Sequence, residues 1–330
     1  MSTMQALTYH PQRQQWQRRE LPIPQPHEHD VLVRIIACGL NPVDAKIRLW
    51  QGIAPDMNEN WVAGLDIAGE VCATGAAVTQ WRVGDRVLTH GNMFRPHGGL
   101  AKYSLQDART LIPHPQCSPE IAAATPCAGW TAWRALHDKL RITSQDRLLI
   151  AGGAGGTGSF AIQIAKMAGV AMIMVTTSGK NAEFVRQLGA SHVIDYQQGD
   201  WRETVKMLTQ GQGASKGLDT VGADNARWVA DSLGFEGEMV ELVDVLAPRD
   251  YANSFSYGLS FHQLSLGSGH RHGDIGRATL TRTGLAFSQA LEAGQIRVPQ
   301  LEVISLEQAG AALDNMLQQR TVGKVVVSMA

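Results

Sequence analysis

Hydrophobic and polar positions follow two different patterns along the chain. Up to about residue 120, short apolar runs are separated by glycine and proline, which is typical of strands in a small barrel or sandwich. We expect a strand at Val31–Ala37, another within Trp61–Ala73, and a third entered through the turn at Val83–Leu88. The first part of the chain is therefore predicted to be β-rich.

In the second part, strand-like and helix-like runs alternate. Helices are expected at Ser159–Met167, Ala182–Leu188, Trp201–Leu208 and Asn225–Leu233, and strands at Arg147–Ala151, Val170–Val175, His192–Asp195, Leu218–Val221 and Glu238–Val243. This succession predicts a doubly wound parallel sheet, which binds its ligand at the carboxyl ends of the strands. After this succession, strands and helices no longer alternate regularly. The last elements are helices at Leu285–Leu291 and Ala309–Gln318 and a strand at Gly323–Val327, and we expect them to belong to the first domain.

A glycine-rich turn joins the first strand of this alternation to its helix. Gly153, Gly155 and Gly158 match G-x-G-x-x-G, in which the glycines allow a tight turn, a close approach to a pyrophosphate, and close helix packing. The free N–H groups of the following helix would hold the phosphates. We predict dinucleotide binding here, with Gly156 and Thr157 also in contact; a turn that serves packing alone is the alternative.

Composition narrows the possible functions. The 330 residues suit two domains, and 44% hydrophobic and 18% charged residues are typical of a globular protein. A net charge of -1 argues against a general nucleic-acid or membrane-surface binder. There is no bilayer-length apolar run or signal-peptide core, and the four cysteines form no C-x-x-C pair. We therefore expect a cytoplasmic protein with free thiols.

Several segments resemble the medium-chain dehydrogenase/reductase superfamily, and within it the zinc-independent, zeta-crystallin-like quinone oxidoreductases and enone reductases. They are Gly39–Lys46, Gly64–Val71, Val83–Val87, Gly98–Tyr103, Pro126–Ala132, the glycine turn and Thr321–Val327. The resemblance implies an α/β protein with a GroES-like β-rich catalytic domain, residues 1–123 and 268–330, and a Rossmann domain, residues 124–267. The active site would lie in the cleft, and a homodimer is usual in this family.

The resemblance also raises the question of zinc, since alcohol dehydrogenases of the superfamily bind a catalytic zinc through Cys, His and Cys. The corresponding positions here are Asn41, Leu65 and Cys127, so one thiolate remains where three protein ligands are needed. His270 and His272 have no third ligand nearby in the sequence, and we interpret them as part of a polar loop. We predict no metal.

Cofactor choice depends on the end of the second strand of the alternation. NAD-selective proteins place a carboxylate there, whereas this chain has Thr176–Lys180, which includes Ser178 and Lys180. This composition would accept the 2′-phosphate of NADP(H). The resemblance implies that Lys180, Tyr196 and Arg320 contact this phosphate and that Thr131 contacts the cofactor. The alternative for Lys180 is an exposed lysine beside a strand end.

Two residues are candidates for the chemistry. Asn41 could donate a hydrogen bond to the substrate where zinc would otherwise bind, and the resemblance implies that Lys46 faces the nicotinamide and the substrate. A lysine there could polarise the substrate oxygen or relay a proton; the alternative is a solvated helix residue. Asp44 is interpreted as a capping and packing residue rather than an acid.

The resulting hypothesis is an NADPH-dependent, zinc-independent oxidoreductase that reduces quinones or the C=C bond of α,β-unsaturated carbonyls. The alternatives are a zinc-free alcohol or aldehyde reductase and an NADPH-binding sensor or scaffold without turnover. The expected partners are a small-molecule quinone or enone and a second copy of the chain, with no nucleic acid and no membrane. Trp50, Trp61, Phe94 and Phe261 suggest an apolar substrate, or else belong to the core.

Overall fold

The computed structural model describes residues 2–244, 248–318 and 321–329, and the chain forms two compact units. Unit 1 comprises Met1–Trp130, Leu266–Gly294 and Gln300–Ala330, and unit 2 comprises Thr131–Ser265 and Gln295–Pro299. One contains a largely antiparallel sheet and the other a parallel sheet with intervening helices, which confirms the predicted α/β class.

A seven-stranded sheet forms the centre of unit 1. Its order is β14-β15-β3-β4-β5-β7, with β6 paired to β3, and β1 pairs with β2 separately. The strands are β1 (Thr3–His10), β2 (Gln15–Pro22), β3 (Asp30–Leu40), β4 (Asp66–Thr74), β5 (Arg86–His90), β6 (Tyr103–Asp107), β7 (Ile112–Pro113), β14 (Leu301–Ile304) and β15 (Lys324–Ser328). The antiparallel register pairs Asp66 with Gly39 and Val325 with Leu40, which brings the ends of three strands together.

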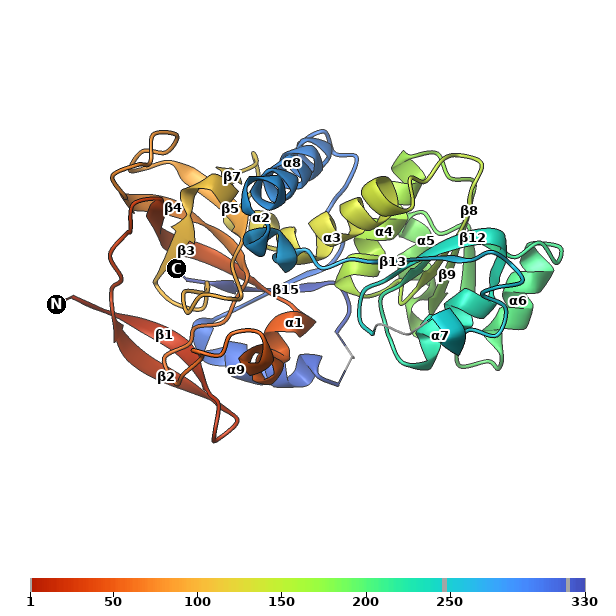
Figure 1. The fold of residues 1–330 in the computed structure, drawn as a ribbon, viewed down its shortest axis with the longest axis horizontal. Helices are drawn as coiled ribbons and strands as arrows, with labels where there is room; N and C mark the ends of the chain where they lie inside the picture. The colour runs from red at the N-terminus through yellow and green to blue at the C-terminus, as the bar shows by residue number, and fades with distance from the viewer. Residues whose placement is uncertain (1, 245–247, 319–320, 330) are drawn as a thin grey trace. The chain divides into compact units, whose positions relative to one another are not determined.

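The helices of unit 1 come from three parts of the chain. They are α1 (Pro42–Ala45), α2 (Pro119–Ala123), α8 (Gly273–Glu292) and α9 (Leu306–Met316), with a π-helical turn at Pro126–Trp130. Figure 1 shows α8 beside β7 and α9 beside α1, so elements from the end of the chain pack on elements from its beginning. Gly284 allows this close packing, because a Cβ there would lie 2.7 Å from the Trp130 ring.

Trp50 and Trp61 belong to the core of unit 1. Both are almost fully buried, among the apolar side chains of β1, β3, β4 and α9. The indole N–H of Trp50 donates to the Val43 carbonyl oxygen at 3.1 Å. Of the two interpretations left open by the sequence, core packing is the correct one for these two residues.

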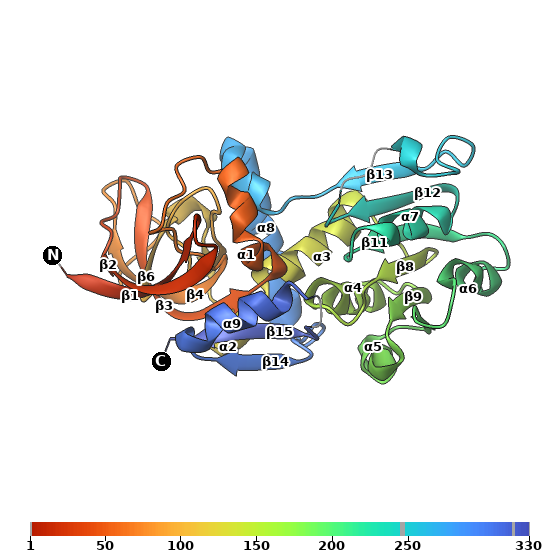
Figure 2. The ribbon, with the colours of Figure 1, turned by 90° about the horizontal axis from the view of Figure 1, so that it is seen from below.

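Unit 2 contains a six-stranded sheet in which all neighbours are parallel. The order is β10-β9-β8-β11-β12-β13, and Figure 2 shows these strands side by side from β13 to β9. The strands are β8 (Arg147–Ala151), β9 (Met172–Thr177), β10 (His192–Asp195), β11 (Ala214–Asp219), β12 (Leu233–Glu241) and β13 (Ser260–Gln263). From β8 the chain adds β9 and β10 on one side, and it then adds β11, β12 and β13 on the other side, so the strand order switches between β8 and β11. Doubly wound sheets bind their ligands at this switch point.

Helices connect the strands of this sheet. They are α4 (Gly156–Met167), α5 (Ala182–Leu188), α6 (Trp201–Leu208) and α7 (Asp224–Asp231), preceded by α3 (Thr131–Trp133) and a π-helical turn at Arg134–Lys139. Eight consecutive residues of α4, from Gly158 to Ala165, are buried. The helix packs against α3, α5, β8 and β9, which fixes the position of its N-terminus. Within the described ranges, no helix combines the length and apolarity needed to cross a membrane.

Candidate functional site

Asp66, the first residue of β4, is the centre of a buried polar cluster in unit 1. Its Oδ2 accepts a hydrogen bond from the side-chain amide of Asn41 at 2.8 Å, and the Lys324 ammonium lies 3.6 Å from the same oxygen. Its Oδ1 accepts from the backbone N–H of Cys127 at 2.8 Å. One carboxylate thus connects β4 with the start of α1, with β15 and with the π-helical turn.

Asn41 and Lys324 are also bound to each other. Lys324 donates to the side-chain oxygen of Asn41 and, at 3.1 Å, to the carbonyl oxygen of Leu40. The pairing of Val325 with Leu40 places the lysine at this point. Exposed fractions of 2% for Asn41 and 3% for Lys324 show that the contacts are closed to solvent. The structure therefore places Asn41 between a carboxylate and an ammonium group.

Asp44 stabilises the loop geometry around this cluster. Its carboxylate accepts from the backbone N–H groups of Asn41 at 3.0 Å, Gly64 at 3.2 Å and Leu65 at 3.1 Å. This confirms its interpretation as a capping and packing residue. Burial and the nearby Asp66 charge raise the pKa of Asp44 to about 7.

The two buried carboxyl groups share one ammonium group. Burial raises the pKa of Asp66 to about 6, although Lys324 and the hydrogen bonds from Asn41 and Cys127 favour its charged form. Lys324 lowers the pKa of both carboxyl groups, so the charge state of the cluster depends on the position of this ammonium group.

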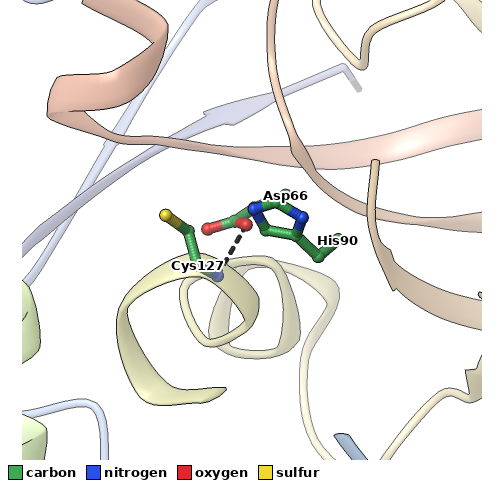
Figure 3. Close-up of side chains that lie close together, drawn as sticks. All are labelled: Asp66, His90 and Cys127. Atoms are coloured by element: carbon green, nitrogen blue, oxygen red, sulfur yellow. Dashed lines mark hydrogen bonds between the residues drawn. The ribbon is translucent and has the colours of Figure 1, made fainter. Parts of the chain in front are cut away.

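Asp66, His90 and Cys127 bring three possible metal-ligand atoms within 4.8 Å of one another (Figure 3). His90 is buried, and its Nδ1 has no hydrogen-bond partner within the described part of the chain. Burial, with the neighbouring His270, lowers the pKa of His90 to about 3, so its imidazole is neutral. Burial raises the pKa of the Cys127 thiol well above its usual value.

Sequence reasoning did not find this group of three. The residues come from the start of β4, the end of β5 and the π-helical turn, so no local spacing connects them. Leu65, the second position considered for zinc, is a buried core residue. His270 uses its Nε2–H to donate to the His90 carbonyl oxygen at 2.9 Å, and His272 uses its Nδ1–H to donate to the Ser268 carbonyl oxygen at 2.8 Å.

Lys46 follows directly after α1 and is half-buried. Its side chain makes no hydrogen bond or ion pair with any residue in the described ranges. In the same unit, the Arg271 guanidinium lies 3.6 Å from the centroid of the Phe94 ring and donates to the Ile53 carbonyl oxygen. The Lys46 ammonium group is therefore uncommitted within the part of the chain that the structure describes, whereas the Arg271 guanidinium covers one face of the Phe94 ring.

The glycines of the turn between β8 and α4 are required for different reasons. A Cβ on Gly153 would lie 2.0 Å from Val175 Cγ1, and a Cβ on Gly158 would lie 2.3 Å from the Gly152 carbonyl oxygen. At Gly155 the nearest atom would be 3.6 Å away, and its φ of -73° is open to any residue. Among the described residues, a side chain at 155 would meet only an ordinary van der Waals contact, so packing does not account for a glycine at this position.

The ends of β9 and β10 lie next to each other in unit 2. Ser178 is buried, Lys180 is exposed, and the Tyr196 side chain is 49% exposed. A Cβ on Gly179 would lie 2.7 Å from the Asp195 carboxylate, which accepts hydrogen bonds from Gln197 and Gln198. Asp195 directly precedes the candidate residue Tyr196, but the sequence predicted it only as the last residue of a strand.

The remaining cofactor candidates are placed as follows. Thr131, the first residue of α3, is half-buried in unit 2, where α3 packs against α4. Gly156 and Thr157 form the first turn of α4, whose N–H groups have no acceptor within the helix. Arg320 lies outside the described residues.

Two family models match the chain. Residues 27–116 match the alcohol dehydrogenase GroES-like domain, and residues 156–243 match the zinc-binding dehydrogenase model. The first match lies in unit 1 and the second in unit 2, so both predicted domain types are confirmed.

Similar proteins include two plant proteins. The chain is 31% identical over 237 residues to the chloroplastic quinone-oxidoreductase homolog of Spinacia oleracea, with 68% of this chain and 69% of that protein covered. It is 35% identical over 188 residues to the chloroplast envelope quinone oxidoreductase homolog of Arabidopsis thaliana, covering 54% of this chain and about half, 55%, of that protein's length.

A solved structure shows the same fold over nearly the whole chain. The mycobacterial protein Rv1454c, determined in complex with NADPH, superposes with a TM-score of 0.85 at 25% sequence identity, covering 98% of this chain and 99% of the other.

The zinc implied by the second family model can be tested against the residues present. Asp66, His90 and Cys127 have suitable donor atoms, and three protein ligands suffice for a catalytic zinc. However, both Asp66 oxygens accept hydrogen bonds, and an ammonium group lies 3.6 Å from one of them. A zinc ion bound by that oxygen would lie within about 6 Å of a fixed positive charge. In this arrangement the residues do not fit a zinc ion.

Proposed function

The chain belongs to the medium-chain dehydrogenase/reductase superfamily, and on that premise we propose that it is an NADPH-dependent, zinc-independent oxidoreductase. Its substrates would be quinones or α,β-unsaturated carbonyl compounds whose C=C bond is reduced. Two plant relatives whose names refer to quinone oxidoreductases support this substrate class.

The observation that carries the proposal is the glycine at 155, directly before α4, where a side chain would meet only an ordinary contact within the described residues. Gly153 and Gly158 are explained by packing, whereas Gly155 is explained by a ligand that approaches the backbone. A pyrophosphate there would meet the N–H groups of Gly156 and Thr157 and the positive end of the helix dipole. Gly155 thus favours a dinucleotide over the alternative of a turn that serves packing alone.

Selection of NADPH over NADH would come from the end of β9. Ser178 and Lys180 stand where a carboxylate would bind the ribose of NAD, and an exposed ammonium group suits a 2′-phosphate. Tyr196 would contact the same phosphate, and Thr131 would contact the cofactor. The solved relative that holds NADPH supports this choice.

Lys46 is the group that we assign to the reacting oxygen. When bound, NADPH supplies the hydride. The uncommitted ammonium of Lys46 would stabilise the negative charge that develops on the substrate oxygen, or donate a proton to it. Asn41 donates to Asp66 in the structure, so its proposed contribution is to fix the start of α1, at whose end Lys46 stands.

The test is the identity of the product. Purified, chelator-treated protein is supplied with NADPH deuterated at the transferred position, together with quinones, enones and aldehydes. The proposal expects hydroquinones, or saturated ketones labelled at the β-carbon. Allylic alcohols labelled at the carbinol carbon would instead establish a carbonyl reductase, and bound NADPH with no product from any substrate would favour a sensor.

Two further features are proposed, the first of them from the family resemblance. We expect a homodimer, measured by light scattering coupled to size exclusion, and a cytoplasmic location, measured by fractionation. A monomer at micromolar concentration would contradict the first expectation, and recovery in a membrane fraction or an organelle would contradict the second.

A further inference from the structure

We propose that the Lys324 ammonium is the resident cation of the Asp66–His90–Cys127 cluster, where it takes the place of a divalent metal ion. The corollary is that the cluster binds such an ion only when the charge of Lys324 is removed. This inference deepens the metal independence of the proposed function, and its test measures bound metal rather than turnover.

The contacts of Lys324 support this assignment. Its ammonium donates to the Leu40 carbonyl oxygen and the Asn41 side-chain oxygen and lies 3.6 Å from Asp66 Oδ2, so oxygen atoms surround it as they would a bound cation. Only 3% of the residue is exposed. The pairing of the next residue, Val325, with Leu40 fixes the backbone from which the lysine side chain extends.

The donor atoms themselves would suit a transition metal. Carboxylate oxygen, imidazole nitrogen and thiolate sulfur are the ligand types that bind Zn²⁺ and Co²⁺. The Nδ1 of His90 is a buried polar atom without a partner in the described ranges. The donor atoms are therefore suitable, and the obstacle to a metal ion is its repulsion by the positive charge of Lys324.

The electrostatic effect of the lysine is large. An ion bound by Asp66 Oδ2 would lie within about 6 Å of the ammonium group, where a divalent and a monovalent cation repel each other strongly inside a protein. Asn41 cannot relieve this repulsion, because its amide already bridges the carboxylate and the ammonium. Removal of one charge should thus raise metal affinity about 100-fold or more.

The experiment compares the wild-type protein with Lys324→Met after chelation and titration with Co²⁺, followed by absorption spectroscopy and metal analysis. We expect no stoichiometric metal in the wild type. Lys324→Met should bind about one Co²⁺ per chain, with the charge-transfer absorption of a cobalt–thiolate bond. The double variant Lys324→Met/Cys127→Ser is the matched control, and it should lose that absorption.

Two results would overturn the inference: stoichiometric Co²⁺ with the thiolate absorption in the wild type, or no Co²⁺ in a Lys324→Met protein whose circular dichroism shows it to be folded. If Lys324→Met does not fold, Lys324→Gln replaces it, because the glutamine amide is neutral and can still donate to the oxygens of Leu40 and Asn41. The results expected for Lys324→Met are then expected for Lys324→Gln. NADPH turnover is measured separately, so a failed proposal of enzymatic function leaves this result unaffected.

Discussion

The ammonium of Lys324 and the carboxylate of Asp66 lie 3.6 Å apart in a part of unit 1 that is closed to solvent. They come from opposite ends of the chain, and Asn41 binds both of them. A charge pair in such surroundings depends on its hydrogen bonds, because the loss of one partner leaves a buried charge without compensation. The first prediction follows from this relationship.

Asn41→Leu should lower the free energy of unfolding by about 2–4 kcal/mol, since it removes the amide that links Asp66 and Lys324. The measurement is urea denaturation. The control is Lys46→Ala, which removes a side chain without partners among the described residues and should change stability by no more than about 0.5 kcal/mol while reducing turnover. Equal stability of the two variants would contradict the account of the cluster.

Gly155→Ala and Gly158→Ala should separate cofactor binding from folding. Alanine at 155 meets only ordinary contacts in the protein, so the variant should keep the wild-type melting temperature but bind NADPH about 10-fold or more weakly. Alanine at 158 would press on the Gly152 carbonyl oxygen and should lower the melting temperature. Unchanged NADPH affinity in Gly155→Ala would refute the proposed role of Gly155 in cofactor binding.

Lys180→Ala and Asp195→Asn should change cofactor preference in opposite directions. Loss of the exposed ammonium should weaken NADPH by about 10-fold and leave NADH nearly unchanged. Loss of the carboxylate beside Gly179 should strengthen NADPH, because it removes repulsion of the 2′-phosphate. Dissociation constants from fluorescence titration with both cofactors decide the point. A parallel change for NADPH and NADH would show that neither residue meets the phosphate.

Asp44→Asn should flatten the pH dependence of stability. The pKa of Asp44 is about 7 in the folded protein, above its usual value of about 4, so the folded state holds the proton more tightly. Its contribution to stability is fully present below about pH 4 and is lost as the pH rises through about 7. Denaturation between pH 4 and pH 8 should show a steeper decline for the wild type than for the variant.

His90 has the opposite effect on the pH dependence of stability, over a similar pH range. Its pKa of about 3 lies below the usual value, so its contribution to stability is lost on acidification from about pH 6.5. Because both proteins in the comparison contain His90, its contribution cancels in the difference between their curves, which reports Asp44 together with its interaction with Asp66. Parallel curves would mean that Asp44 does not titrate in this range.

The sequence predicted most of unit 2 because its signals there are local. The bounds of α5, β10 and α6 are as predicted, since each has its own periodicity and flanking turn residues. The edge strand β13 was not predicted, because Ser260–Gln263 contains one apolar residue and its pattern is half-exposed. β12 begins five residues earlier than predicted, because glycines at 234 and 237 obscured the strand pattern.

The candidate site of unit 1 was predicted only in part. Asn41 and Cys127 were singled out, whereas Asp66, His90 and Lys324 were not. The sequence predicted Lys324 only as part of the strand at Gly323–Val327. Its proximity to Asn41 follows from the register between β15 and β3. Asn41 and Lys324 are almost 300 residues apart, and the spacing of nearby residues cannot predict a contact over that separation.

Consumption of NADPH before and after removal of metal tests the central claim most directly. Wild-type protein is dialysed against a strong chelator, its residual metal is measured, and kcat/KM is determined with NADPH and NADH against one quinone and one enone. We predict NADPH-dependent turnover of at least one of these substrates that chelation leaves unchanged. Activity that disappears with the metal and returns with added zinc would contradict the account.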